Sequence, residues 1–247
     1  MKTIVIVGAK SGIAKECAKL WLKSEAVHLY LVVRSSLEAD SLAVDLRIRS
    51  PSSLIEVLQA DFMDTHSIQD ITRSIAAKTA IEIVLIAHGT LPDQQESEQN
   101  LDLCKHTLDI NGVSPCLFAE AFANAMQNQA GGSIAVIGSV AGDRGRKSNY
   151  IYGSAKGLVA RYVEGMQHRF AGGSLKICLV KPGPTATPMT EHLQGQGVKM
   201  ASASLVAQDI IEGIAKGSSV IYTPRKWQII MLIIRHLPAF IFNKLNI

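Results

Sequence analysis

The sequence lacks the features of several functional classes. Its four cysteines are scattered, with no Cys-x-x-Cys pair and no cluster with histidine, which favours reduced thiols in a cytoplasmic protein and gives no sign of a metal site. The formal net charge is only +4 over 247 residues, and no dense run of lysine and arginine suggests nucleic-acid binding. The apolar run near the N-terminus has five residues and ends at Gly8, which is too short for a signal peptide.

Short apolar runs, several of them rich in β-branched residues, recur along the chain. The predicted strands are residues 3–7, 27–33, 54–59, 81–86, 133–137, 175–180 and 220–222. Helical patterns separate these runs, and such alternation is typical of a parallel sheet with helices on both faces. We therefore predict an α/β fold of the Rossmann type, with seven parallel strands in a single domain over residues 1–247 and with ligands at the carboxyl ends of the strands.

The first predicted strand runs directly into a turn that contains two glycines. Gly8 permits the tight turn, and Gly12 lets the backbone approach a pyrophosphate at the N-terminus of the following helix. Lys10, Ser11 and Ile13 lie in the same turn and complete the cofactor contacts predicted there. The spacing is G-x-x-x-G rather than G-x-G-x-x-G, so a plain strand–turn–helix connection is the alternative.

The second predicted strand ends in Arg34 and Ser35, where the adenosine ribose of a dinucleotide would lie. An acidic residue here would bind a ribose 2′-hydroxyl, whereas an arginine suits a 2′-phosphate through charge-assisted hydrogen bonds. Because this strand end has no Asp or Glu, NADP(H) is preferred over NAD(H), and Lys10 could add a second cation. The alternative for Arg34 is a solvated charge on a loop.

The next two strand ends supply further predicted cofactor contacts. Asp61, beside Phe62, could accept a hydrogen bond from an adenine amino group; otherwise it caps the helix that starts near residue 65. Gly89 would let the chain pass close to a ribose. His88, next to Ala87, is expected to form a wall of the cofactor cleft rather than to act as a catalyst.

Tyr152 and Lys156 lie four positions apart in a predicted helix, so the phenol and the ammonium can point into one pocket. A nearby cation favours the phenolate and is expected to lower the pKa of Tyr152, as suits a general acid that works near neutral pH. Ser139, just after the strand at 133–137, could reach the same place with its hydroxyl. Surface helices produce a Tyr-x-x-x-Lys pair by chance, so the pair needs the support of the other motifs.

Asn111 and Gly112 fall inside a helical pattern that extends from about residue 96 to residue 128. Both residue types are unfavourable within a helix, so we expect a local kink whose freed backbone groups hold water.

A proline-rich loop follows the sixth predicted strand and contains Pro182, Gly183, Thr185 and Thr187. Proline prevents this stretch from remaining regular. Residues 194–204 are polar and contain glycine, as expected for a mobile lid. The substrate pocket would be built from residues 141–148, this lid and the C-terminal tail.

Together these stretches resemble the short-chain dehydrogenase/reductase family over about residues 3–223. The matching residues are Asn111, Ser139, Tyr152 and Lys156 of the family's catalytic set, the adenine-side acid Asp61, and the nicotinamide loop from Pro182 and Gly183 through Thr187. The resemblance implies hydride transfer between nicotinamide C4 and a carbonyl carbon. Since cells usually keep NADP(H) reduced, it favours reduction of a ketone to a secondary alcohol.

The resemblance also implies the role of each matching residue. Tyr152 would give a proton to the developing alkoxide, and Ser139 would donate a hydrogen bond to the same oxygen. Lys156 would hold the nicotinamide ribose and lower the pKa of Tyr152, and Asn111 would anchor a water that relays protons to Lys156.

Other parts of the resemblance concern how the cofactor is held. Thr187 and the backbone of Thr185 would fix the nicotinamide carboxamide. The chain departs from the family pattern at Ala14, where a third glycine is usual, and at residues 86–89, which read IAHG instead of Asn-Asn-Ala-Gly. The second departure removes a stabilising asparagine near the adenosine.

The C-terminal tail, residues 225–247, is apolar over much of its length and carries basic residues at its ends. Its uninterrupted apolar run is far below the roughly 20 residues that span a bilayer. We expect an apolar helix that packs between subunits of a homodimer or homotetramer, or that rests on a membrane surface. The protein would then be cytoplasmic, with peripheral attachment to the inner face of the membrane as the alternative.

The tail and residues 88–94 together are similar to a branch of the family that includes decaprenylphosphoryl-2-keto-ribose reductases. This weaker resemblance implies a lipid-linked keto-sugar as substrate. A generic 3-oxoacyl or small-ketone reductase is the competing enzyme. A nucleotide-binding sensor without turnover is a third hypothesis, although such a protein should show damage in the catalytic set.

Overall fold

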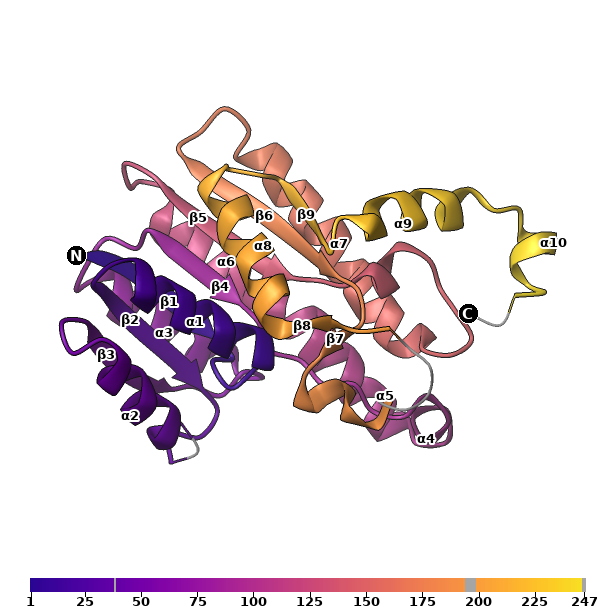
Figure 1. The fold of residues 1–247 in the computed structure, drawn as a ribbon, viewed down its shortest axis with the longest axis horizontal. Helices are drawn as coiled ribbons and strands as arrows, with labels where there is room; N and C mark the ends of the chain where they lie inside the picture. The colour runs from indigo at the N-terminus through magenta and orange to yellow at the C-terminus, as the bar shows by residue number, and fades with distance from the viewer. Residues whose placement is uncertain (38, 194–198, 246–247) are drawn as a thin grey trace.

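A computed structural model describes residues 1–37, 39–193 and 199–245 (Figure 1). Seven parallel strands form one sheet in the order β3-β2-β1-β4-β5-β6-β9. They are β1 (Lys2–Val7), β2 (Val27–Val33), β3 (Leu54–Gln59), β4 (Ile83–Ile86), β5 (Gly132–Ile137), β6 (Leu175–Pro182) and β9 (Val220–Thr223). The Rossmann-type α/β fold and the seven parallel strands are confirmed.

Helices cover both faces of the sheet. One face packs against α1 (Gly12–Ser24), α2 (Asp40–Arg49) and α8 (Ala203–Ala215), and the other against α3 (Thr65–Ala76), α6 (Ser114–Met126) and α7 (Tyr150–Arg169). Successive strand residues point to opposite faces: Ile4 and Ile6 enter one core, whereas Val5 and Val7 enter the other. The continuous apolar runs of the sequence are explained by this burial on both faces.

The long helix predicted from about residue 96 is interrupted twice. A short helix, α4 (Gln94–Gln99), ends at Asn100, whose extended backbone breaks the pattern and whose side chain caps α5 (Leu101–Leu108) by accepting from the Leu103 N–H. A π-helical turn, η1 (Asp109–Val113), then joins α5 to α6. It contains Asn111 and Gly112, so the kink predicted there takes the form of a π-helical turn.

Short elements surround the carboxyl ends of the strands. They are the 3-10 turns η2 (Val140–Asp143) and η3 (Pro188–Leu193), and the small parallel pair β7 (Thr185–Ala186) and β8 (Ala201–Ser202). Of the lid predicted at 194–204, residues 194–198 lie outside the described residues, and β8 and the start of α8 occupy the remainder.

The described part of the tail forms α9 (Lys226–His236) and α10 (Ala239–Phe242). These helices extend from the side of the molecule opposite the N-terminus (Figure 1). Only Met231 of α9 is buried, while Ile229 and Phe240 are 66% and 71% exposed. Across the described ranges, no helix combines the length and hydropathy that crossing a membrane requires.

Candidate active site

A cavity of about 370 Å³ opens at the carboxyl ends of β1, β2, β4, β5 and β6. Eighteen of the residues named from the sequence line it: Gly8, Lys10, Ser11, Gly12, Ile13, Arg34, Phe62, Ala87, His88, Gly89, Asn111, Ser139, Tyr152, Lys156, Pro182, Gly183, Thr185 and Thr187. Ser35 and Asp61 do not line it. Residues separated by up to about 180 positions in the sequence therefore converge on one site.

The glycine turn between β1 and α1 forms one wall of the cavity. Gly8 has φ +79°, and a Cβ there would lie 2.6 Å from the Cβ of His88, so only glycine fits. A Cβ on Gly12 would lie 2.9 Å from Cγ2 of Thr187, across the cavity mouth. The Ser11 side chain does not cap α1, so the first N–H groups of this helix are left for a ligand. This geometry fits a pyrophosphate.

Arg34 lies at the end of β2 and lines the cavity. It is exposed, and its guanidinium forms no ion pair with the residues that the structure describes. The nearby Asp61 is exposed, and its carboxylate accepts a hydrogen bond from the Met63 N–H at 2.8 Å. The cap of α3 is Asp64 rather than Asp61, because Asp64 accepts from the first-turn N–H groups of that helix. The capping alternative for Asp61 is therefore wrong.

His88 forms a buried wall, as predicted from its position. Its ring lies 4.7 Å from that of Phe62 and 5.5 Å from that of Phe118, and Nε2 is 2.9 Å from the Ser114 hydroxyl. Burial, together with the cations Lys156 and Arg34, lowers the pKa of His88 to about 3. The imidazole is therefore neutral at pH 7.

The π-helical turn brings Asn111 to the inner edge of the cavity, where it is fully buried. Its Oδ1 accepts from the Thr90 N–H and its Nδ2 donates to the Thr107 carbonyl, both at 2.9 Å. A Cβ on Gly89 would lie 2.5 Å from Asn111 Oδ1. Each end of the side chain thus makes one hydrogen bond, which fixes its orientation at the edge of the cavity.

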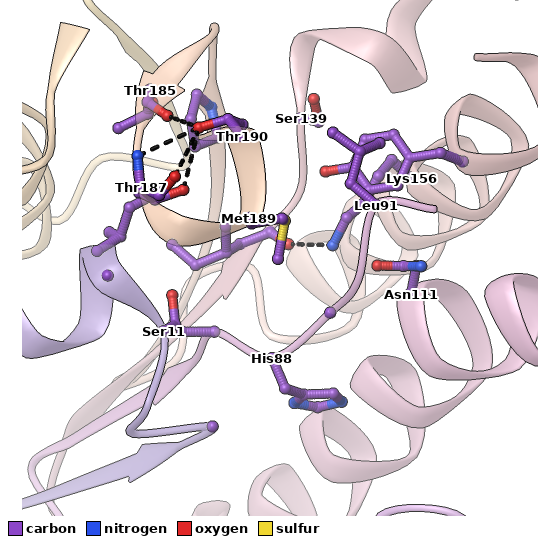
Figure 2. A pocket seen from close by; sticks show the side chains of 18 of the residues that line it. Ser11, His88, Leu91, Asn111, Ser139, Lys156, Thr185, Thr187, Met189 and Thr190 are labelled. Atoms are coloured by element: carbon purple, nitrogen blue, oxygen red, sulfur yellow. Dashed lines mark hydrogen bonds between the residues drawn. The ribbon is translucent and has the colours of Figure 1, made fainter. Parts of the chain in front are cut away.

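Ser139, Tyr152 and Lys156 meet on the side of the cavity opposite the threonines of the loop after β6 (Figure 2 labels Ser139, Lys156 and the threonines). Ser139 lies two residues after β5 and caps η2, where its Oγ accepts from the Ala141 N–H at 3.1 Å. Lys156 Nζ donates to the Ile137 carbonyl at 3.0 Å and lies 5.8 Å from the centre of the Tyr152 ring. The side chains predicted to share one pocket do so.

The pKa of Tyr152, beside Lys156, differs from the prediction. Burial raises the pKa of Tyr152 to about 12, and a hydrogen bond with Ser139 acts weakly in the opposite direction. Burial also lowers the pKa of Lys156 to about 8. Desolvation disfavours both charged forms, so the net pKa of Tyr152 is raised where a lowered one was expected.

Thr190 organises the loop after β6, and the sequence analysis missed it. Its hydroxyl donates to the Thr185 carbonyl at 2.6 Å, and the Thr187 N–H donates to that hydroxyl at 3.2 Å (Figure 2). The Thr185 hydroxyl donates to the Gly183 carbonyl at 2.9 Å. The Thr-x-Thr-x-x-Thr spacing in the printed sequence is the signal that could have found it.

The parallel sheet, the glycine turn at its switch point and the Ser–Tyr–Lys cluster together define a dinucleotide-binding oxidoreductase. The model of the short chain dehydrogenase family matches residues 2–196, and the chain belongs to that family.

Relatives and solved structures agree with this membership. An oxidoreductase from Streptomyces coelicolor is 26% identical over 247 residues, which is 99% of this chain and 96% of the relative. A short-chain dehydrogenase from Sphingobium yanoikuyae, solved in complex with NADPH, has a TM-score of 0.83 at 21% identity over 97% of each chain. A bulky-bulky ketone specific alcohol dehydrogenase from Comamonas testosteroni has a TM-score of 0.79 at 22% identity, over 97% of this chain and 96% of that one.

Proposed function

We propose that this oxidoreductase uses NADP(H) to reduce a ketone to a secondary alcohol, with Tyr152 as the general acid. The observation that carries the proposal is that Ser139, Tyr152 and Lys156 line the same cavity as the glycine turn and Arg34. A carbonyl can thus be held between proton donors and a bound dinucleotide. Family membership supports the reaction class, and the ketone named for the Comamonas neighbour supports the substrate class.

The predicted cofactor contacts follow the nucleotide from its pyrophosphate to its two ends. Gly8, Ser11 and Gly12 would hold the pyrophosphate with Lys10 and Ile13 beside them, and Arg34 would bind the 2′-phosphate with Ser35 next to it. Toward the adenosine, the predicted contacts are Asp61, Phe62, Ala87, His88 and Gly89. Toward the nicotinamide, they are Tyr152, Lys156, Pro182, Gly183, Thr185 and Thr187. When bound, the nicotinamide supplies the hydride to the carbonyl carbon.

The protein residues then manage the proton and the developing charge. With a pKa of about 12, Tyr152 keeps its proton at neutral pH and can donate it to the alkoxide. Ser139 donates a hydrogen bond to the same oxygen. Lys156, with a pKa of about 8, is mostly cationic at pH 7, so it stabilises the phenolate that forms after proton transfer. A water held at Asn111 would return a proton to Lys156.

The preference for NADP(H) over NAD(H) rests on Arg34. The end of β2 presents this cation to the cavity, and no acidic side chain lines the cavity in the described chain. The NADPH complex of the Sphingobium neighbour is consistent with this preference. Because cells usually keep NADPH reduced, reduction is the proposed direction.

Fluorescence titration with NADPH and NADH tests the cofactor. Arg34→Asp is expected to weaken NADPH binding about 10- to 100-fold, since it removes a charge-assisted hydrogen bond and adds a repulsive charge, while NADH binding changes little. Arg73→Asp, an exposed arginine outside the cavity, is the matched control. Equal losses for both nucleotides in Arg34→Asp would contradict the assignment.

NADPH oxidation with a panel of ketones tests the reaction. Turnover of any ketone separates an enzyme from a nucleotide-binding sensor. Comparison of 3-oxoacyl thioesters, small ketones and lipid-linked keto-sugars then separates the substrate classes. Binding of NADPH without turnover of any of them would favour the sensor.

We further propose a lipid-linked keto-sugar as the substrate, and the C-terminal tail supports this choice. Its apolar side chains are exposed, and its first turn touches the site because a Cβ on Gly183 would overlap the indole of Trp227. The same exposed face would suit a subunit contact in a homodimer or homotetramer. Sedimentation with anionic and neutral vesicles, together with the mass in solution, distinguishes peripheral membrane contact from a subunit interface.

A further inference from the structure

The side of the cavity beyond Ser139 carries a cation that the proposed reaction does not use. Four cations line the cavity: Lys10, Arg34, Arg146 and Lys156. Lys10 and Arg34 belong to the phosphate end, and Lys156 belongs to the catalytic cluster. Arg146 lies between η2 and α7 and lines the same cavity.

The Arg146 side chain is partly desolvated. It is half-buried, and its Nε is fully buried with no hydrogen-bond partner. Burial lowers the pKa of Arg146 from its ordinary value, and only the charge of Asp143 acts against this. A buried Nε–H without a hydrogen-bond partner costs free energy that an acceptor atom of a ligand would offset.

The nearby carboxylate of Asp143 is already neutralised. Its Oδ1 accepts from Lys181 Nζ at 2.6 Å and its Oδ2 from the Tyr222 hydroxyl at 2.8 Å. The Asp143 and Lys181 side chains are 3% and 6% exposed, so the two charges cancel inside the protein. The charge of Arg146 is therefore left over.

A second unpartnered polar atom lies on the same loop. Asn149 lines the cavity, and its Oδ1 is buried with no hydrogen-bond partner. Asn149 sits at the N-cap of α7, yet its side chain makes no capping hydrogen bond. Two side chains that line one cavity, each with a buried polar atom that lacks a hydrogen-bond partner, are the features of a site for a polar ligand.

The loop that carries both residues is held in place. Arg144 Nη1 donates to the carbonyls of Ile234 and Leu237 at 2.5 and 2.6 Å, and its guanidinium lies 3.8 Å from the Phe242 ring centre. The Asn149 N–H donates to the Arg146 carbonyl at 3.1 Å, which closes a turn. Arg146 is thus presented from an anchored backbone, which reduces the entropy lost on binding.

We propose that Arg146 binds an anionic group of the substrate, a carboxylate or a phosphate, while Asn149 binds a neighbouring polar group. This specificity site rests on the proposed ketone reductase function and narrows its substrate class to anionic ketones. Arginine suits either anion because its planar guanidinium forms two parallel hydrogen bonds.

Steady-state kinetics with matched substrates test the proposal. The probes are oxo acids whose carboxylate lies one to five carbons from the ketone, each compared with its methyl ester, and a ketose phosphate compared with the free ketose. Wild type is expected to favour the anion at least tenfold in kcat/KM at the best length. The carboxylate series and the phosphate pair distinguish the two anions.

Variants assign the preference to one side chain. Arg146→Met should lower the anion-to-neutral ratio about 10- to 100-fold, mainly through KM, and Arg146→Lys should lower it less because the paired hydrogen bonds are lost but the charge remains. Lys147→Met removes the adjacent exposed cation, which does not line the cavity, and should leave the ratio unchanged. A ratio near one in wild type, or an unchanged ratio in Arg146→Met, would overturn the proposal.

Calorimetry separates this proposal from the reductase function. The preferred anion is titrated into wild type and Arg146→Met, each with and without NADP⁺, so that no turnover is needed. Wild type should bind it, and Arg146→Met should bind at least tenfold more weakly while its circular dichroism is unchanged. Absence of anion binding to wild type refutes the role of Arg146, whereas absence of turnover with every ketone refutes the reductase.

Discussion

The two ends of the cavity are built differently. At the cofactor end, backbone geometry dominates: a glycine at positive φ, the open start of α1 and the strand ends form the surface. At the substrate end, long side chains outside the cavity fix the loop after Ser139: Lys181 joins it to β6, and Arg144 joins it to the tail. A backbone-built site depends on local spacing, while a site built from side chains can change its specificity without changing the fold.

The largest expected effect is on the rate of ketone reduction, and it should leave cofactor binding nearly unchanged. Tyr152→Phe removes the hydroxyl that gives up the proton, so kcat for ketone reduction is expected to fall about 10²- to 10⁴-fold. NADPH binding should change far less, because backbone groups make most of the predicted contacts. Stopped-flow absorbance measures the rate of NADPH oxidation, and fluorescence titration measures the affinity for NADPH. Retention of near wild-type kcat would remove Tyr152 from the mechanism.

The next test removes the buried ion pair between Asp143 and Lys181, which lies beside the substrate end. Asp143→Asn leaves the buried ammonium of Lys181 without its counter-charge, and we expect a loss of about 3–5 kcal/mol in the free energy of unfolding. Urea denaturation measures it. The exposed pair of Lys216 and Glu212 provides the control, because Glu212→Gln should cost less than about 1 kcal/mol. A similar small loss in Asp143→Asn would show that the buried pair does not anchor the loop.

A pH test addresses the cofactor end. His88 has a pKa of about 3 when folded against 6.5 as its ordinary value, so between these values the unfolded chain binds the extra proton. The contribution of His88 to the free energy of unfolding is thus fully present above pH 6.5 and is lost as the pH falls toward 3. Between pH 7 and pH 5, wild type should lose about 2 kcal/mol more than His88→Gln. Equal losses in urea denaturation would mean that His88 titrates normally.

The smallest effect concerns the adenine contact predicted for Asp61. Asp61 does not line the cavity, and its carboxylate already accepts from the Met63 N–H. One exposed hydrogen bond to an adenine amino group would be weak, so Asp61→Asn is expected to raise the Kd for NADPH only about two- to tenfold. An unchanged Kd would place the adenine elsewhere.

The contrast between the two ends also explains what the sequence could predict. Strand burial on both faces, the glycine turn and the spacing of Tyr152 and Lys156 are local patterns, and the structure shows each of them. The break at Asn100 was missed because a capping asparagine inside a helical pattern resembles an ordinary polar position. The high pKa of Tyr152 was missed because burial depends on the packing of the whole fold.

Arg144 has a consequence for the whole molecule. It ties the loop beside the substrate to the carbonyls of Ile234 and Leu237, so these two parts of the chain share one arrangement. Under thermodynamic reciprocity, any occupant of the exposed tail that changes substrate affinity by some factor has its own affinity changed by substrate by the same factor. Measuring either binding event with and without the other reports the coupling, and the part that is lost in Arg144→Met is the part carried by this arginine.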